Sequence, residues 1–306
     1  MNSPKKLVFV VGVGRSGTTL LQSMLNNHSN ITFPPESHIV SRYVVPEYVK
    51  KNKTSQDSNE IKKQLVTNTN IDRLEINIDE VIKQVLREGT FTYKRFFCEI
   101  IKNYCKKNKK EIGGEKDPVN VHYIAELSEC FPESIFIHII RDPRDIILSR
   151  GKVKWADKMS FLKHLLEFKY GIFLAEKGRQ YCKNRYIEVR YEELLLNPER
   201  ELKILSSFLN LEYEKDMLTY YKTSNTIVSK EELSWKANVM KPILSDNINK
   251  WKKEMGRGKL FLLEVFLVNE MRKLGYDLKN NSILLKIANV PTIALFAYYK
   301  WKLSKN

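Results

Sequence analysis

The sequence predicts an α/β fold in three layers, with a central parallel sheet flanked by helices on both faces. Continuous apolar, β-branched runs stop at glycine or proline, which is typical of strands buried on both faces. Segments with helical spacing of apolar residues alternate with these runs, and such alternation indicates parallel strands. The chain has 306 residues and is 42% hydrophobic, which is enough apolar material for one large domain.

The first expected strand and helix meet at a glycine loop. Residues 7–13 form a continuous apolar run, and apolar residues recur at helical spacing from Thr18 to about Asn27. A strand, a glycine turn and a helix N-terminus present backbone N–H groups to one point, which suits a phosphate. Gly12 and Gly17 have P-loop spacing, but Thr18 replaces the lysine of that motif and Arg15 lies inside the loop. The sequence therefore predicts a P-loop-type fold with an anion-binding loop unlike that of standard ATPases.

The remaining elements follow in alternation. Further strands are expected at 31–33, near 112–116, at 135–140 and at 186–191. Helices are expected as a pair within 79–105 and at about 121–127, 146–150, 157–181, 202–209 and 259–274. We expect residues 1–280 to form a single domain, with a mobile polar insertion at about 50–70 and a lid-like segment at about 222–250. An apolar helical tail follows at 281–306, and we favour a helical hairpin covering the domain over a membrane-surface segment.

The charge and the cysteines limit the class of protein. The formal net charge of +16 favours anionic partners such as nucleotides, acidic acceptors, nucleic acid or an anionic membrane, although most of the lysines fit a solvated surface. The cysteines have neither metal-ligand spacing nor disulfide-rich density: Cys98, Cys105, Cys130 and Cys182. No stretch is long and apolar enough to span a membrane. We expect a cytoplasmic protein, with a peripheral contact at the inner membrane face as a further possibility for the tail.

Basic side chains recur where the expected strands end. Arg15 lies in the first loop, Lys116 ends the strand near 112–116, and Arg141 follows 135–140 with Ser149 eight positions later. The carboxyl ends of parallel strands meet at one edge of a sheet, so these groups can converge on one ligand. Two anion-binding groups and a lysine indicate a nucleotide with anionic groups at both ends.

A loop behind two prolines carries further candidates for chemistry. Glu36 and His38 follow Pro34 and Pro35 after the short strand at 31–33, where α/β enzymes carry catalytic groups. No metal is expected, because the loop lysine is absent and the candidate aspartates precede prolines, as turn or helix-start residues do: Asp117 and Asp142.

Four motifs in this order resemble those of sulfotransferases that use 3′-phosphoadenosine 5′-phosphosulfate (PAPS), over about residues 5–275. Gly14-Arg15-Ser16-Gly17-Thr18-Thr19-Leu20 resembles their 5′-phosphosulfate loop, and Arg141-Asp142-Pro143-Arg144-Asp145 with Ser149 is similar to their 3′-phosphate motif. Tyr191-Glu192-Glu193-Leu194 with Asn197-Pro198-Glu199 is similar to the segment whose tyrosine lies near the adenine, and Lys241-Pro242-Ile243 with Lys250-Trp251 resembles their closing segment.

The spacing is most similar to that of the tyrosylprotein sulfotransferase branch. There the catalytic glutamate follows the loop arginine by 21 positions, which gives Glu36 (36 − 15), and the catalytic lysine precedes the 3′-phosphate arginine by 25, which gives Lys116 (141 − 116). Trp235 stands at the place of the branch's active-site serine, and Ser234 is one position off. Of the arginines that hold acidic peptides in animal enzymes, Arg42 is matched and His38 replaces another. Phe33 and Gly114 stand at the positions of the disulfide cysteines of those enzymes. We expect no membrane anchor, which would fit a bacterial-like relative.

The resemblance implies transfer of a sulfuryl group from PAPS to an acceptor hydroxyl of a glycan, a tyrosine or another alcohol, without a metal. Glu36 would be the general base, Lys116 and Arg15 would stabilise charge, and His38 and His122 are alternative bases. The implied nucleotide-binding residues are Arg15, Ser16, Gly17, Thr18, Thr19, Arg141, Ser149, Tyr191, Lys241 and Lys250, and the implied acceptor-binding residues are His38, Arg42 and Ser234.

Two other function classes remain open. A P-loop kinase or NTPase would need Mg²⁺ and ATP, and a non-catalytic, membrane-associated nucleotide-binding protein would tolerate loss of Glu36. The expected partners are PAPS or its product 3′-phosphoadenosine 5′-phosphate (PAP), a hydroxyl acceptor, a membrane surface at the tail and a second copy in a homodimer, but no nucleic acid.

Overall fold

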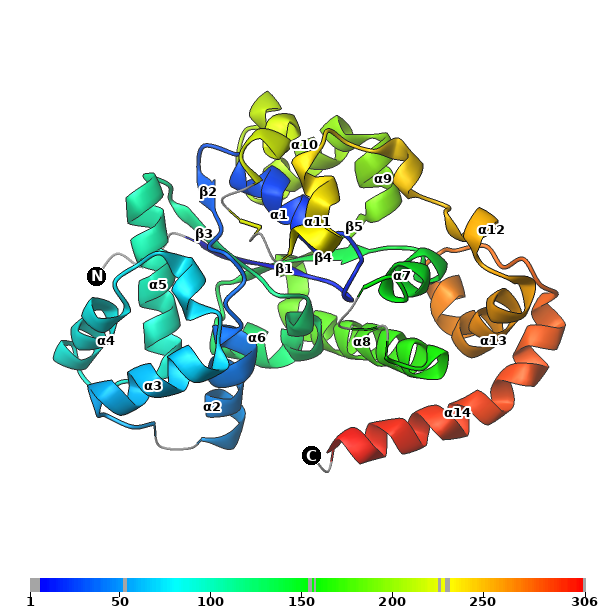
Figure 1. The fold of residues 1–306 in the computed structure, drawn as a ribbon, viewed down its shortest axis with the longest axis horizontal. Coiled ribbons are helices and arrows are strands. Elements are labelled where there is room, and N and C mark those ends of the chain that lie inside the picture. Colours follow the sequence, from blue (N-terminus) through cyan, green and yellow to red (C-terminus); the bar gives the residue numbers. More distant parts are fainter. Residues whose placement is uncertain are drawn as a thin grey trace.

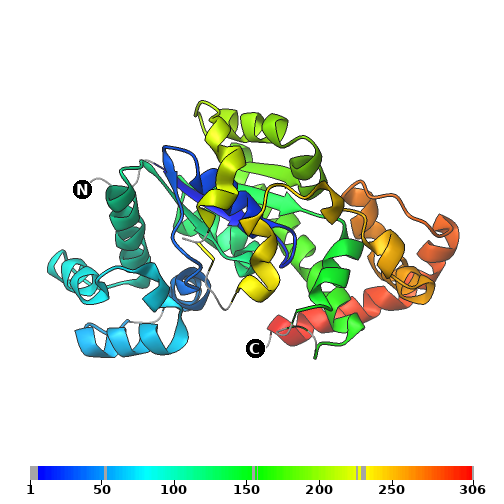
Figure 2. The same cartoon turned by 45° about the horizontal axis from the view of Figure 1, so that its top comes forward.

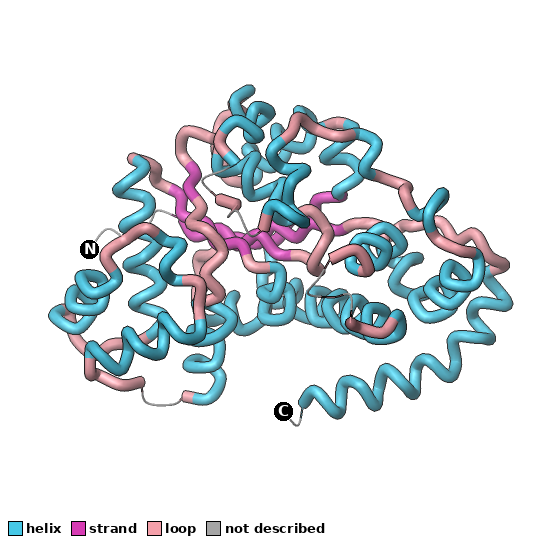
Figure 3. Tube along the Cα trace, in the orientation of Figure 1, coloured by secondary structure: helices cyan, strands magenta, loops and turns pink. Residues whose placement is uncertain are grey.

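The computed structural model describes residues 6–51, 54–153, 156, 158–224, 227–228 and 232–304. Within them, five parallel strands form one sheet in the order β2-β3-β1-β4-β5, at the centre of the molecule (Figure 3). The strands are β1 (Lys6–Val11), β2 (Ile31–Thr32), β3 (Ile112–Lys116), β4 (Ile135–Ile140) and β5 (Tyr186–Arg190). The α/β fold with a central parallel sheet is confirmed.

The register of the sheet brings the predicted strand ends together. In the centre, β1 pairs with β3 so that Val10 lies opposite Lys116, and with β4 so that Val11 lies opposite His138. Further out, β4 pairs with β5 up to Arg190. The loops that follow these strands therefore begin side by side at one edge, as the parallel arrangement predicts.

Alternation along β1 divides the core into two layers. Phe9 and Val11 are buried in one apolar cluster, and Val8 and Val10 in another. The first cluster includes residues of η1 (Val40–Val44), α2 (Val45–Lys50), α3 (Ser58–Asn68), η2 (Ile71–Leu74), α4 (Ile78–Arg87), α5 (Tyr93–Asn108), η3 (Pro118–Tyr123), α6 (Ile124–Cys130) and α8 (Phe161–Cys182). The second includes residues of α1 (Thr18–Asn26), α9 (Tyr191–Leu196), α10 (Pro198–Phe208), η5 (Lys215–Lys222) and η7 (Ala237–Met240). Helices thus cover both faces of the sheet (Figure 1).

A third apolar cluster joins the C-terminal helices to α8. These C-terminal helices lie beside the sheet (Figure 2). The cluster includes residues of α7 (Pro143–Arg150), α13 (Arg257–Lys273) and α14 (Ser282–Ser304), together with the start of α8. Four short helical elements lie in the connecting segments: η4 (Lys183–Arg185), α11 (Leu233–Lys236), η8 (Ser245–Asn247) and α12 (Trp251–Glu254). No helix in the described ranges combines the length and the apolar character needed to cross a bilayer.

Two segments differ from the sequence prediction. The insertion at about 50–70 contains the helix α3, whose first turn is capped by the Asp57 carboxylate at 2.8 Å from the Glu60 N–H. Ile61 and Leu65, four residues apart, are buried in the core, and two apolar residues in a polar stretch were too weak a signal. The tail forms one helix rather than a hairpin, and α14 continues through Pro291. The buried side chains of Leu285 and Phe296 anchor both halves on the body of the protein, which offsets the hydrogen bond that proline cannot make.

Candidate active site

A cavity of about 1110 Å³ lies at the edge of the sheet where the strands end. Its wall is built from the glycine loop after β1, the loop after β2, η3, α8 and α9, the segment 232–247, and the end of α14. Most of the residues predicted from strand ends meet in this cavity or directly behind its wall. The lid-like role predicted for 222–250 stays a prediction, although part of that segment lines the cavity.

The glycine loop reaches the cavity by a turn that excludes larger residues. Gly17 has a φ of 102°, and a Cβ atom there would lie 2.4 Å from the Tyr191 ring. The N–H of Ser16 donates to the Val13 carbonyl at 3.0 Å and closes the turn, while the buried Ser16 hydroxyl has no partner among the described residues. Within the described residues, no side chain caps α1, which begins at Thr18, so its first N–H groups are available for an anion.

Two arginines stand together without a carboxylate. Arg15 donates from Nε to the Ser149 hydroxyl at 3.1 Å and from Nη2 to the Trp235 carbonyl at 2.9 Å. Arg141 donates to the carbonyls of Arg15 at 3.1 Å and Asn247 at 2.8 Å. Neither arginine forms an ion pair within the described part of the chain. Burial and the neighbouring Arg141 lower the pKa of Arg15. Since no described carboxylate forms an ion pair with either arginine, an anionic ligand would supply the direct partner that both lack.

Tyr191 forms the wall beside these arginines. The Arg141 guanidinium lies over its ring, 4.2 Å from the centroid, and the Asn247 amide donates to its hydroxyl at 2.6 Å. Burial raises the pKa of Tyr191, so its phenol stays neutral. The structure therefore brings Arg15, Arg141 and Tyr191 together from three different strand ends.

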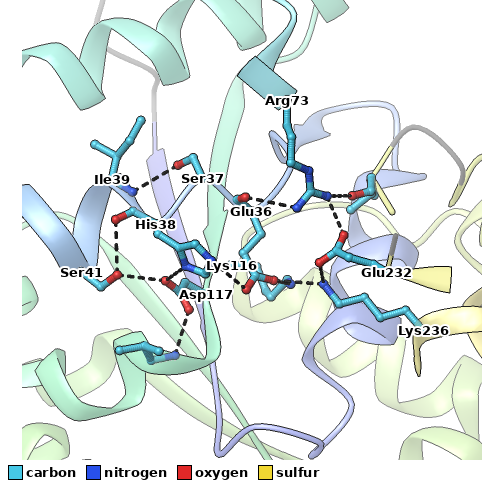
Figure 4. A network of polar contacts seen from close by, with 12 residues as sticks. Glu36, Ser37, His38, Ile39, Ser41, Arg73, Lys116, Asp117, Glu232 and Lys236 are labelled. Carbon is cyan, nitrogen blue, oxygen red and sulfur yellow. Dashed lines mark hydrogen bonds and ion pairs between the residues drawn. The ribbon is translucent and has the colours of Figure 1, made fainter. Parts of the chain in front are cut away.

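Glu36 lines the same cavity, in contact with two lysines (Figure 4). Its Oε2 atom accepts a hydrogen bond from Lys116 Nζ and lies 3.2 Å from Lys236 Nζ. Burial by itself raises the pKa of Glu36, but the ammonium groups of Lys116 and Lys236 outweigh it and hold the pKa far below the usual value. Glu36 is therefore an ionised carboxylate that faces the cavity.

His38 is held next to Glu36 by Asp117. His38 Nδ1 lies 2.8 Å from Asp117 Oδ2, and its Nε2 atom lies 3.9 Å from Glu36 Oε1. Asp117 also accepts from the Ser41 hydroxyl at 3.0 Å and from the Val119 N–H at 3.0 Å. The hydrogen bond to Asp117 raises the pKa of His38, which favours the imidazolium form.

Glu36, His38 and Asp117 could in principle hold a metal, since one ligand atom from each lies within 4.8 Å of the others. The two lysines on Glu36 argue against this use of the group, because a dication would have to displace two ammonium groups from the carboxylate. The electrostatics of the cluster suit an anionic ligand better than a cationic one.

Lys236 is a site residue that the sequence did not reveal. It joins Glu36 to Glu232, whose other oxygen accepts from Arg73 Nη2 at 2.6 Å (Figure 4). Arg73 also donates to the Glu36 carbonyl at 3.4 Å. The residues around Lys236 have no clear periodicity, and the motif spacing pointed to the neighbouring Trp235 and Ser234 instead. Only the folded chain therefore shows that Lys236 contacts Glu36.

Several predicted residues lie elsewhere. Lys241 and Lys250 are outside the cavity lining, as is the exposed Arg42 of η1. Lys241 is exposed as well, and the contact at this position is made by its backbone carbonyl, which accepts from the Tyr220 hydroxyl at 3.0 Å. Their binding roles stay predictions that would need movement of the flanking segments.

Of the remaining predicted residues, the structure describes the side chain of His122 but not that of Ser234. His122 does line the cavity, and burial lowers its pKa to about 4, so its imidazole is neutral near pH 7. Ser234 belongs to α11, and its side chain is outside the described part of the chain.

The model of the sulfotransferase family matches residues 8–215, more than half of the chain. The chain belongs to the sulfotransferase family. The prediction of this family from the motif order is thereby confirmed, and the matched range contains the glycine loop, Glu36, Lys116, Arg141 and Tyr191.

Curated relatives of this chain include protein-tyrosine sulfotransferases. The Drosophila melanogaster protein is 25% identical over 261 residues, which cover 82% of this chain and 48% of that relative. Homo sapiens protein-tyrosine sulfotransferase 1 is 26% identical over 280 residues, which cover 89% of this chain and 70% of the relative. The chain thus spans only about half the length of the Drosophila protein.

The fold has a solved counterpart. The sulfotransferase domain of the Synechococcus PCC 7002 olefin synthase superposes with a TM-score of 0.63 at 20% identity, over 91% of this chain and 97% of that domain. This likeness confirms the fold of the sulfotransferase.

Proposed function

We propose that this sulfotransferase transfers the sulfuryl group of PAPS to an acceptor hydroxyl, with Glu36 as the general base. The observation that carries the proposal is the layout of the cavity: two arginines without counterions lie beside a glycine loop, and an ionised carboxylate between two lysines faces the same space. Positive groups at separate places suit a nucleotide with anions at both ends.

The polar atoms of the site that have no hydrogen-bond partner fit PAPS as the bound sulfuryl donor. The Ser16 hydroxyl and Arg141 Nε are buried without partners within the described ranges, although buried polar atoms nearly always have one. Arg15 and the N–H groups at the start of α1 would bind the 5′-phosphosulfate, Arg141 with Ser149 the 3′-phosphate, and the Tyr191 ring would lie beside the base.

In the proposed step, the acceptor oxygen forms a bond to sulfur while the bond from sulfur to the phosphate oxygen breaks. Glu36 takes the proton of the hydroxyl, and PAP leaves with the electron pair of the broken bond. Lys116 and Arg15 stabilise negative charge on the transferred group and on the leaving phosphate. No metal is needed, since these residues supply the positive charge themselves.

The strongly lowered pKa of Glu36 has a consequence for this step. A carboxylate held by two ammonium groups is a weak base. An anionic donor competes for Lys116, and loss of that partner would raise the pKa of Glu36. We infer that donor binding is what makes Glu36 an effective base.

The acceptor and the surroundings of the enzyme belong to the same proposal. The relatives are named for protein tyrosine, so a peptide tyrosine is one acceptor to test, and glycans and other alcohols are the others. We propose a cytoplasmic location, because the free thiols Cys98, Cys105, Cys130 and Cys182 suit a reducing compartment. A homodimer and a peripheral membrane contact of 281–306 complete the predicted partners, and nucleic acid is not among them.

The test is turnover of sulfur-labelled PAPS with a panel of hydroxyl acceptors in the presence of EDTA. Wild type should form labelled product, and Glu36→Gln should lose about 10² to 10⁴-fold in kcat while PAP binding is retained. Glu133→Gln, an exposed control, should match wild type. Metal-dependent ATP hydrolysis without sulfuryl transfer would contradict the proposal and favour a kinase or NTPase.

A further inference from the structure

The outer side of α14 is an apolar surface of unusual extent. Its 23 residues run along the margin of the molecule (Figure 1). Seven large apolar or aromatic side chains of this helix are each 52–67% exposed: Ile283, Leu284, Ile287, Val290, Ile293, Tyr298 and Trp301. Spacings of three and four residues recur among them and gather them on one side of the helix. We call this set the α14 face; contiguous exposed apolar patches of this kind mark interaction sites.

The inner side of α14 is already packed on the protein, so the α14 face does not turn inward. Leu285 is buried with Val265 and Val268 of α13. Asn289 donates to the Val265 carbonyl at 2.6 Å, and the Phe296 ring meets Phe173 of α8 edge-on at 6.1 Å. These contacts fix the orientation of the helix and leave the α14 face on the surface.

The charges along the C-terminal segment suit an anionic membrane, with the Lys300 ammonium packed over the Phe173 and Phe296 rings on the inner side of α14. Residues 278–306 contain no aspartate or glutamate and five lysines: Lys279, Lys286, Lys300, Lys302 and Lys305. Near its C-terminal end the α14 face carries Tyr298 and Trp301, whose rings lie 5.8 Å apart. Aromatic side chains with lysines beside an apolar face are typical of helices that lie in the membrane interface.

The same end of α14 forms part of the cavity wall. Tyr299 and Leu303 line the cavity, and the Tyr299 ring packs edge-on against Tyr170 of α8 at 6.0 Å. Trp301, which is 52% exposed, lies between these two residues in sequence. One helical turn therefore carries both the surface residue and the cavity residues, so a membrane at the α14 face would meet the cavity on this side.

We propose that α14 lies on an anionic membrane surface and that the acceptor hydroxyl is carried by a lipid headgroup at that surface. Membrane binding by α14 does not depend on the proposed function, whereas the lipid acceptor rests on it. A headgroup would enter between η3, α8 and α14, where His122, Tyr170 and Tyr299 line the cavity, while its chains stay in the bilayer.

Membrane binding is tested by co-sedimentation of the full chain with vesicles. Wild type should bind vesicles of phosphatidylcholine with phosphatidylglycerol and bind vesicles of phosphatidylcholine alone about tenfold less. Ile287→Glu and Val290→Glu should each reduce binding about tenfold, because both place charge on the apolar side. Ile204→Glu on α10, where the side chain is 48% exposed and far from α14 in the sequence, is the matched control and should bind as wild type does.

The acceptor class is tested with labelled PAPS and a pair of probes that share their hydroxyls. Dodecyl maltoside incorporated in anionic vesicles should be sulfated with a kcat/KM at least about tenfold above that of methyl maltoside in solution. In Ile287→Glu this advantage should fall while PAP binding, which monitors folding, is retained.

Three outcomes overturn the inference. If wild type does not bind anionic vesicles, the α14 face does not bind membranes. If kcat/KM is equal for the two probes, the acceptor is not a lipid headgroup, although sulfuryl transfer still occurs. A dimer in light scattering that Ile287→Glu dissociates would assign the α14 face to a second copy of the chain. Absence of any turnover of PAPS, with vesicle binding intact, would instead be a failure of the proposed function.

Discussion

At the residue scale, Glu36 owes its charge to two lysines from distant parts of the chain. Lys116 ends β3, while Lys236 belongs to α11, and both contact the same carboxylate oxygen. Burial, and then the nearby Lys116, lower the pKa of Lys236, which shows how strongly the site concentrates positive charge. Lys236 therefore acts through Glu36 as a positioning residue in our proposal.

Lys236→Met should move the pH profile of the reaction. Removing one ammonium group raises the pKa of Glu36, so the acid limb of kcat/KM for the acceptor, measured with PAPS saturating, should shift upward by about one pH unit. Lys236→Arg should restore the profile in part, and the exposed Lys163→Met should leave it unchanged. A lower kcat with an unmoved acid limb would show that Lys236 is merely structural.

At the element scale, the glycine loop and α1 form one unit whose shape depends on the neighbouring strand ends. The loop fits against Tyr191, at the start of α9, because Gly17 has no side chain. Long periodic segments such as α4, α5 and α8 were predictable, since their apolar stripes are local in sequence. The helix α3 was not, because it contributes only two buried apolar residues to the core.

Gly17→Ala tests whether the glycine loop and α1 need a residue without a side chain beside Tyr191. The left-handed φ should cost about 1–2 kcal/mol of unfolding free energy in any L-residue, and the overlap with the Tyr191 ring should displace the loop and weaken PAP binding. Gly258→Ala is the matched control, since its Cβ meets nothing within 4 Å and it lies in α13. Urea unfolding and PAP titration give both readouts, and a Gly17→Ala protein that matches Gly258→Ala in both would contradict the argument.

At the scale of the whole molecule, the buried carboxyl of Glu115 links stability to pH. It lies in the central sheet, 1% exposed, with one oxygen unpartnered within the described residues. Burial, followed by the charges of Asp117 and Glu36, raises its pKa well above the usual value. The folded state therefore favours the protonated acid, and the stability that this supplies is complete below the unfolded pKa and lost as pH rises towards the folded pKa.

Glu115→Gln should reduce the loss of stability that wild type shows as pH rises. Wild-type unfolding free energy should fall as pH rises above the ordinary glutamate pKa of about 4.3, with a slope of up to about 1.4 kcal/mol per pH unit for this one proton. The variant should show a smaller fall. The exposed Glu133→Gln is the control, with denaturant unfolding at several pH values as the measurement. If the unfolding free energies of Glu115→Gln and wild type change with pH in the same way, the protonation of Glu115 does not stabilise the folded state.

The sequence alone determined the parallel sheet, the glycine loop and the meeting of Arg15, Arg141 and Ser149 at one edge. These features follow from local patterns and from the rule that parallel strands end together. Glu36 and Lys116 were each identified through motif spacing, whereas their contact with each other is seen only in the structure. Only the tertiary structure decided that Lys236 also holds Glu36 and that α14 contributes Tyr299 to the cavity. Both contacts are made by segments whose positions depend on packing far along the chain, and no local period or motif encodes such an encounter.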